Sequence, residues 1–406
     1  MTAESASAVE EDVMEDVVIV GAARTPIGRF NGAYAGLTAI DLGAAAVRAA
    51  VERAGIDPAS VDECIMGNVV SAGLGQAPAR QAAIKGGLPA SVGALTINKV
   101  CGSGLKAVML GASLIASGQA EVIVAGGMEH MSGAPYLLPR ARHGYRLGHG
   151  ELLDAVVHDG LWCAFEHQHM GNSAEWIART FKVTRTQQDT FALQSHERAV
   201  AAWDAGLFAA EVAPVSVPGP KGAATTVEVD EGPRRDTSLE ALAKLRPAFD
   251  KEGTVTAGNA PGITDGAAAL VLMSASRAAR LGLAPLARVA GSAQAAVPPL
   301  EVFTAPPFAI RALMERTGTT IDDYDLFELN EAFAAQVIAN IREAGLDPDR
   351  VNVNGGAIAL GHPIGASGAR VLVTLIYALR ARGRRRGIAS LCLGGGEAVA
   401  LAAEAL

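Results

Sequence analysis

Two cysteines and one histidine, widely separated in the sequence, each lie among glycines. Cys101 is in N-K-V-C-G-S-G-L-K-A, His362 is in G-G-A-I-A-L-G-H-P-I-G-A-S-G, and Cys392 begins C-L-G-G-G. A nucleophilic thiol, an imidazole base and a second thiol are groups that acyl transfer uses. The three residues therefore point to acyl-transfer chemistry.

Cys101 lies between an apolar extended run (94–97) and a helix-like stretch (104–117). A thiol at the start of a helix feels the partial positive charge of the helix terminus, which lowers its pKa below about 8.5. Gly102 and Gly104 would let a backbone or a ligand approach closely, which favours a nucleophile over a buried structural thiol. This setting predicts a reactive thiolate near neutral pH.

His362 is followed by Pro363, which holds the loop extended, and is flanked by Gly361 and Gly365. The glycine-rich setting favours a side chain that faces a cavity over a structural histidine. An imidazole suits the deprotonation of a thiol because its unperturbed pKa is near 6.5. Cys392 ends a predicted strand, and the backbone N–H groups of the glycines after it could bind a thioester oxygen.

Asn330, in F-E-L-N-E-A-F-A-A, follows a predicted strand and precedes a predicted helix, and two interpretations stay open. It could cap the helix, or its amide could position a water or the histidine for oxyanion stabilisation. Cys64 and Cys163 are expected in the core. His167 and His169 have no nearby carboxylate cluster, so no metal site is predicted.

The composition excludes several classes of protein. The 406 residues suggest two or three domains, and 50% hydrophobic with 19% charged residues is typical of a soluble α/β protein. A net charge of −8 argues against nucleic-acid binding, and the arginines at 382 and 384–386 are expected to cap a helix in solvent. No apolar run reaches the roughly 20 residues of a membrane span. Residues 1–15 are acidic, unlike a secretion or transit signal, so we expect a cytoplasmic enzyme.

The chain contains a disguised repeat. In the first half, C-G-S-G opens a helix, and the strand at 121–125 ends in Gly-Gly-Met-Glu (126–129). In the second half, G-A-S-G (365–368) opens a helix, and the strand at 388–393 ends in Gly-Gly-Gly-Glu (394–397). Helices bracketed by short apolar strands predict parallel βαβ units, and their recurrence predicts two similar α/β domains.

The repeat also locates an insertion. The strand that follows Glu397 at once has its counterpart only at 266–273 in the first half, so residues 131–263 form an inserted subdomain. Insertions at the carboxyl ends of parallel strands usually carry substrate contacts. The predicted domains are 1–130 with 264–286, the insertion, and 287–406.

In these motifs the chain resembles the thiolases, and most closely their acetyl-CoA acetyltransferase branch. The resemblance extends from Asp16 onward. The matching segments are V-V-I-V-G-A-A-R-T-P-I-G, N-K-V-C-G-S-G, A-G-G-M-E, H-M-G-N-S-A-E, K-L-R-P-A-F, G-I-T-D-G-A-A-A, N-E-A-F-A, N-V-N-G-G-A-I-A-L-G-H-P-I-G-A-S-G and C-L-G-G-G.

The resemblance implies a five-layered α-β-α-β-α fold of two duplicated halves, with a CoA-binding loop domain inserted in the first. It implies that Cys101 is the acylated nucleophile, His362 its base, and Cys392 the acid/base for the second substrate. Asn330 would hold a water that forms one oxyanion hole with His362, and the N–H groups of Cys101 and Gly394 would form the other.

The implied reaction is the reversible condensation of two acetyl-CoA to acetoacetyl-CoA and CoA through an acetyl-Cys101 intermediate. No metal or redox cofactor is needed, and a homodimer or a dimer of dimers is implied. A broader 3-ketoacyl-CoA thiolase of fatty-acid β-oxidation is the alternative. A non-catalytic acyl-CoA-binding relative is disfavoured because the two cysteines and the histidine are all present.

The resemblance also implies substrate contacts, which are Leu161, His169, Met170, Arg234, Phe249, Ala260, Pro261 and Phe333. The chain departs from the family pattern in three places. Pro261 and Ala241 stand where relatives often have serine, and V-F-T-A-P-P (302–307) replaces M-G-T-G-P. These departures bear on CoA affinity and chain-length preference rather than on the core chemistry.

Overall fold

The computed structural model describes residues 15–219 and 223–406. Most of the acidic N-terminal stretch lies outside these residues. The fold is built on two half-sheets with the same strand order. The first comprises β1 (Val17–Arg24), β12 (Thr264–Ser274), β5 (Val122–His130), β3 (Glu63–Gly67) and β4 (Gly93–Ile97), in that spatial order. The second comprises β13 (Ala287–Ala296), β16 (Glu397–Ala405), β15 (Arg386–Leu393) and β14 (Leu326–Leu329).

The half-sheets join where β1 and β13 pair through Val18 with Arg288 and Ile19 with Ala287. Strand β3 runs parallel to β4 and β5, and β14 runs parallel to β15, as the predicted βαβ units require. Strands β12 and β16 instead pair antiparallel with their neighbours, because each follows its partner without a crossover helix on the sheet. Each half is therefore a mixed sheet rather than a parallel one.

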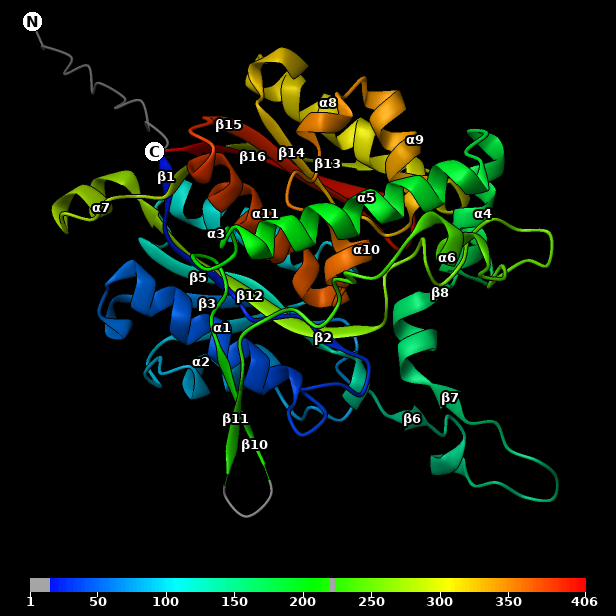
Figure 1. Cartoon of the computed structure of the whole chain (residues 1–406). Helices are drawn as coiled ribbons and strands as arrows, with labels where there is room; N and C mark the ends of the chain where they lie inside the picture. Colours follow the sequence, from blue (N-terminus) through cyan, green and yellow to red (C-terminus); the bar gives the residue numbers. More distant parts are fainter. Residues whose placement is uncertain (1–14, 220–222) are drawn as a thin grey trace, which may run out of the picture.

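Helices complete five layers, so the predicted fold class is confirmed (Figure 1). The middle layer consists of α3 (Ser103–Ala116) and α11 (Ile364–Ala381), which contact both half-sheets. The outer layers are α1 (Ala39–Ala54) with α2 (Pro78–Lys85), and α8 (Ala305–Thr317) with α9 (Ala334–Ala344). Two further helices are short. Helix α7 (Ala275–Arg280) follows β12, and helix α10 (Ala357–Leu360) precedes α11.

The middle helices touch each other through two glycines. A Cβ on Gly104 of α3 would lie 2.6 Å from the backbone nitrogen of Ala369, and a Cβ on Gly368 of α11 would lie 2.3 Å from that of Leu105. The predicted close approach of a backbone at Gly104 is therefore confirmed, and that backbone belongs to α11. This glycine is needed because the backbones of two helices pass too close for a side chain.

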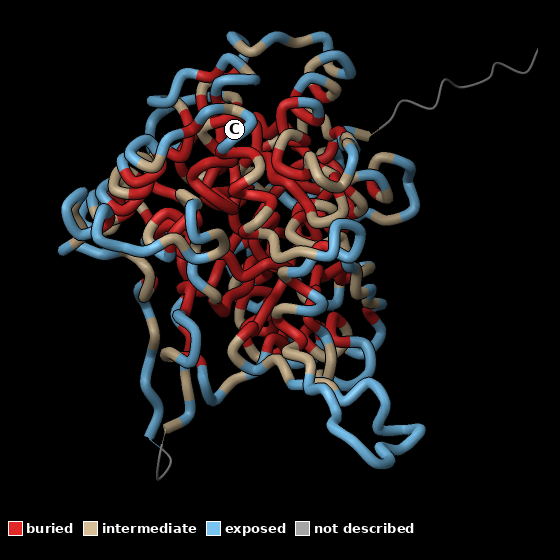
Figure 2. Tube along the Cα trace, turned by 90° about the vertical axis from the view of Figure 1, so that its right-hand side faces the viewer, coloured by how far each residue is buried: buried red, intermediate tan, exposed pale blue. Residues whose placement is uncertain are grey.

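Burial follows this layering. Every residue of β1, β5 and β12 is buried, because helices cover both faces of the sheet. Helix α11 is long and apolar enough to cross a membrane, but 83% of it is buried inside the protein, as in a core helix. Figure 2 shows this buried core, with exposed segments confined to its periphery.

The residues between β5 and β12 form an irregular segment. Its elements are β6 (Tyr136–Leu137), β7 (Leu153–Asp154), a π-helical turn (Val156–Leu161), β8 (Trp162–Cys163), β9 (Gln168–His169), α4 (Met170–Thr180), α5 (Arg185–Asp204), β10 (Val215–Pro218), β11 (Ala224–Val227) and α6 (Leu239–Ala243). The β10–β11 hairpin and the excursion between β6 and β7 project from the body (Figure 1).

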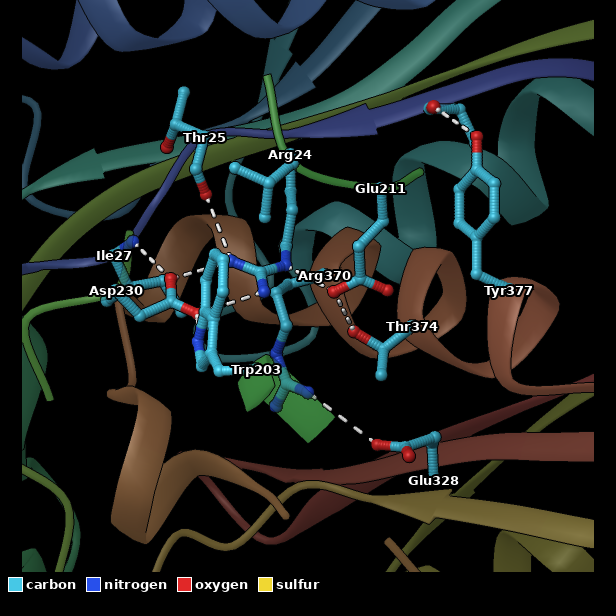
Figure 3. Close-up of polar contacts among 12 residues, drawn as sticks. Arg24, Thr25, Ile27, Trp203, Glu211, Asp230, Glu328, Arg370, Thr374 and Tyr377 are labelled. Atoms are coloured by element: carbon cyan, nitrogen blue, oxygen red, sulfur yellow. Dashed lines mark hydrogen bonds and ion pairs between the residues drawn. The ribbon is translucent and has the colours of Figure 1, made fainter. Parts of the chain in front are cut away.

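A buried ionic network attaches this segment to the core (Figure 3). Arg24 of β1 forms a bidentate pair with Asp230, at 2.7 and 3.0 Å, and a second pair with Glu211 at 2.5 Å. Asp230 also accepts a hydrogen bond from the backbone N–H of Ile27. Since Arg24 and Glu211 are fully buried, loss of one partner would leave an uncompensated charge. The network thus fixes the inserted segment on the first half-sheet.

Candidate active site

One cavity of about 230 Å³ lies where the two halves and the inserted segment meet. Its wall includes Cys101, His362 and Cys392, which the sequence analysis singled out from three distant motifs. All the other predicted site residues line the same cavity except Asn330 and Arg234. The folded chain thus gathers two sulfurs and an imidazole around one largely apolar space.

Cys101 lies two residues before α3, with Gly102 as the N-cap residue of the helix. Burial raises the pKa of the Cys101 thiol to about 12, although hydrogen bonds from the backbone of Gly394 and of Cys101 itself oppose the shift. The predicted lowering of this pKa was therefore wrong, because the cost of burying a charge exceeds the effect of the helix terminus. The resting group is a neutral thiol that needs a base.

The backbone before Cys101 is strained. Val100 has a φ of 44°, a left-handed conformation that a β-branched residue rarely adopts. Ser103 holds this turn, since its hydroxyl donates to the Val100 carbonyl at 2.6 Å and accepts from the Lys99 N–H at 2.8 Å. A Cβ on Gly102 would lie 2.0 Å from the Leu393 side chain, so this glycine serves packing rather than the predicted ligand approach.

The hydrogen bonds of His362 define its tautomer. Its Nδ1 lies 2.6 Å from the hydroxyl oxygen of Ser367, and that hydroxyl already donates to the carbonyl of Pro363 at 2.9 Å. A hydroxyl has one proton, so Nδ1 is the donor, and Nε2 carries the lone pair, which faces the amide of Asn330. Burial, and then the positive charge of Arg370, lowers the pKa of His362 to about 3. The imidazole is therefore a neutral base.

Asn330 lies beside the imidazole of His362. Its Nδ2 is 3.3 Å from Nε2 of His362, and helix α9 begins only at Ala334, so Asn330 does not cap it. Among the residues that the structure describes, the buried Oδ1 of Asn330 has no hydrogen-bond partner. This geometry favours the second interpretation, in which the amide holds a water or the histidine.

Cys392 is the penultimate residue of β15 and is only 2% exposed. Burial, and next the charge of the nearby Cys101, raises the pKa of its thiol well above the usual value. Gly395 and Gly396 have φ values of 93° and 90°, which let the chain turn at once into β16. The turn leaves Gly394 on the cavity wall, facing the first sulfur.

The inserted segment supplies the opposite wall. His169 is the N-cap residue of α4, where its Nδ1 accepts from the N–H of Gly171 at 3.0 Å. Its ring stacks on Phe249, with centroids 4.8 Å apart. A Cβ on Gly171 would collide with the Phe249 ring at 2.3 Å, which explains the glycine of the H-M-G motif. Met170 and Leu161 also line the cavity.

A second cavity of about 340 Å³ adjoins the first and shares Ala260, Gly262 and Ile263 with it. Arg234, which does not reach the catalytic cavity, lies here with Ala241. The sulfurs therefore lie in the first cavity, and the guanidinium groups of Arg29 and Arg234 lie along the second. Pro261 lines only the first cavity.

Several residues that shape the site were not predicted from the sequence. Ser367 lies inside the quoted G-A-S-G motif, and its position five residues after His362 was the available signal. No sequence pattern indicates the strained conformation of Val100. Cys64 and Cys163 are buried and away from the cavity wall, as expected. Within residues 15–219 and 223–406, no group of three or more His, Cys, Asp or Glu is arranged to hold a metal ion.

Comparison with known proteins agrees with this geometry. Residues 17–276 match the family model "Thiolase, N-terminal domain", and residues 283–405 match "Thiolase, C-terminal domain". The chain belongs to the thiolase family. A relative from Pseudomonas aeruginosa, named acetyl-CoA acetyltransferase, is 55% identical over 96% of this thiolase and 99% of the relative. A relative of the same name from Escherichia coli is 54% identical over 97% of this thiolase and 100% of the relative.

A solved thiolase structure is also similar. The crystal structure of the Bacillus anthracis acetyl-CoA acetyltransferase superposes with a TM-score of 0.96 at 44% identity. The match covers 98% of this chain and 100% of that one. The agreement over the whole length extends to the inserted segment as well as to the two half-sheets.

Proposed function

We propose that this thiolase is an acetyl-CoA C-acetyltransferase, which reversibly condenses two acetyl-CoA into acetoacetyl-CoA and CoA. The observation that carries the proposal is the single cavity that holds Cys101, Cys392 and His362, whose Nε2 is unprotonated. The relatives at 50–55% identity that bear the name acetyl-CoA acetyltransferase support this substrate class. They do not favour the broader 3-ketoacyl-CoA thiolase.

In the first half-reaction, the Cys101 thiol gives its proton to Nε2 of His362 as sulfur attacks the thioester carbonyl. The tautomer fixed by Ser367 leaves that nitrogen ready to accept it. The N–H groups of Cys101 and Gly394 stabilise the tetrahedral oxyanion. The C–S bond to CoA breaks, and the departing thiolate takes the proton of Cys392, whose raised pKa makes it a thiol at rest.

In the second half-reaction, the Cys392 thiolate removes an α-proton from a second acetyl-CoA. The enolate oxygen is stabilised by protonated His362 and by a water that Asn330 holds. The enolate carbon attacks the acetyl group on Cys101, and the bond to sulfur breaks. The released thiolate recovers its proton from His362, so protons balance and the chemistry calls for no metal or redox cofactor.

The direct test is thiolysis of acetoacetyl-CoA by CoA, followed through the loss of the acetoacetyl-CoA enolate absorbance. The purified protein should consume acetoacetyl-CoA and form acetyl-CoA, and it should be acetylated by acetyl-CoA alone. Absence of both activities in a folded preparation, with an active thiolase run in parallel, would reject the proposal.

We also propose that the enzyme is a cytoplasmic homodimer or dimer of dimers. Strand β4 lies at the edge of the sheet, where unpaired backbone groups favour pairing with a second copy, and Leu95 on it is 44% exposed. Strand β6 and the excursion that follows it expose further apolar side chains, including Tyr136, Leu138 and Leu147. Sedimentation velocity would distinguish dimer from tetramer, and a monomer at micromolar concentration would contradict both.

A further inference from the structure

Two residues of the 3-10 turn at Pro299–Thr304 lie on the wall of the catalytic cavity. Val302 is 1% exposed and Phe303 is 3% exposed, and the turn contacts β15, the strand that carries Cys392. Val302 and Phe303 are consecutive residues of this turn, and the Phe303 ring is the bulkiest side chain that the turn contributes to the cavity wall.

Phe303 is the last ring of an aromatic series along this wall. Its ring centroid is 5.4 Å from that of Phe333, in an edge-to-face arrangement. The Phe333 ring lies 6.3 Å from that of Phe249, which in turn stacks on His169. The series runs from the start of α4 in the inserted segment to the turn beside β15, and Phe303, at its end, belongs to the same apolar cluster as Cys392.

Buried hydrogen bonds hold this end of the wall in place. The Phe303 carbonyl accepts from Nδ2 of Asn340 at 2.9 Å, and Oδ1 of Asn340 accepts from Nε2 of Gln336 at 2.8 Å. Oε1 of Gln336 accepts from the Ala332 N–H at 3.1 Å. Both amide side chains are 1% exposed, so moving the turn would leave buried polar groups unpaired. The wall is therefore rigid against α9.

We propose that Phe303 is the specificity-determining residue that limits the acyl chain to the length of acetoacetyl. The proposal rests on the thiolase activity proposed above. The cavity must hold the acyl group and the adjoining thioester in about 230 Å³. Further methylene groups would meet a ring that cannot recede, and one methylene in a tight apolar pocket changes kcat/KM by roughly 10–200-fold.

The test compares kcat/KM for thiolysis of acetoacetyl-CoA and 3-ketooctanoyl-CoA in the wild type, Phe303→Ala and Phe303→Leu. The wild type should prefer acetoacetyl-CoA. Phe303→Ala should raise the ratio of 3-ketooctanoyl-CoA to acetoacetyl-CoA by about tenfold or more. Phe303→Leu, which keeps apolar packing, should give a smaller increase in the same direction.

Phe181→Ala is the matched control, because Phe181 packs in the same apolar cluster but does not line the cavity. This variant should leave the ratio of kcat/KM values within about twofold of the wild type, a change well below the effect of one methylene group. If Phe303→Ala does not fold by circular dichroism, Phe303→Leu decides. A wild-type ratio near one, or folded Phe303 variants with the wild-type ratio, overturns the inference. A wild type that cleaves neither substrate instead rejects the thiolase activity, and the inference with it.

Discussion

The starts of the two middle helices are built alike but perform different tasks. Ser103 in α3 and Ser367 in α11 hold equivalent places in C-G-S-G and G-A-S-G, each one residue before a glycine that packs against the backbone of the other helix. The hydroxyl of Ser103 bonds only backbone groups, and so fixes the strained turn that presents Cys101. The hydroxyl of Ser367 bonds an imidazole, and so fixes the tautomer of His362.

The repeat thus gives both halves the same backbone framework, and different residues at equivalent positions give each half its own chemistry. The half-sheets show the same contrast at their carboxyl ends. Glu129, the penultimate residue of β5, is fully buried and accepts from Asn68 and from the backbone N–H groups of Val69, Val70 and Gly365. Its counterpart in the repeat, Glu397, pairs with Lys99 near the surface, while the cavity lies beside β15. Glu129 thus ties the segment after β3 and the start of α11 to β5, whereas Glu397 makes one partly exposed ion pair.

Cys101→Ala gives the largest expected effect. Loss of the nucleophile should lower kcat for thiolysis by more than about 10⁴-fold and abolish labelling by radioactive acetyl-CoA. Cys64→Ala, which removes a buried thiol from β3 in the same half, should retain labelling. Labelling of the Cys101 variant at the wild-type level would show that another residue is acylated.

Glu129→Ala should strongly destabilise the protein. Four N–H donors would lose their acceptor, and each buried unsatisfied donor costs about 1–3 kcal/mol, so the free energy of unfolding should fall by about 3 kcal/mol or more. Glu397→Ala should cost about 0–1 kcal/mol because its ion pair is partly exposed. Urea denaturation of both variants measures the difference. Equal losses of unfolding free energy in the two variants would remove the contrast between the buried Glu129 and the partly exposed Glu397.

Ser367→Ala should lower kcat by roughly 10–100-fold, because His362 loses the partner that keeps Nε2 unprotonated and general-base catalysis typically contributes 10²–10⁴-fold. Ser103→Ala should instead lower the free energy of unfolding by about 1–3 kcal/mol, since two backbone groups of the strained turn lose a partner. Single-turnover acetylation and thermal unfolding separate the two outcomes. An activity loss no larger in Ser367→Ala than in Ser103→Ala would contradict the tautomer role.

The smallest effect concerns pH. Since the pKa of His362 is lowered to about 3, its imidazole stays neutral well below pH 6.5 and protonates only near the lower value. Protonation of this base should therefore not reduce kcat/KM for acetoacetyl-CoA between pH 8 and pH 5. A fall in kcat/KM with an apparent pKa near 6.5, in protein that circular dichroism shows to be folded, would contradict the burial argument.

Secondary structure was predicted well where apolar runs are long. Strands β12 and β15 and helix α3 fall within a few residues of the predicted ranges 266–273, 388–393 and 104–117. The helix predicted after Asn330 begins only at Ala334, because Phe333 is extended with a φ of −158°. The short loop before it carries Asn330. Helix propensity could not reveal that loop, since the fold needs the asparagine beside His362.

The sequence by itself determined which groups are available. Cys101, His362 and Cys392, the repeat and the family resemblance can all be read from residue types and their spacing. Only the tertiary structure decided their state. It made the thiols weak acids, fixed the proton of His362 on Nδ1, and assigned Gly104 to helix packing instead of ligand access. Charge states and close contacts depend on burial and on atoms from distant segments, which no local pattern contains.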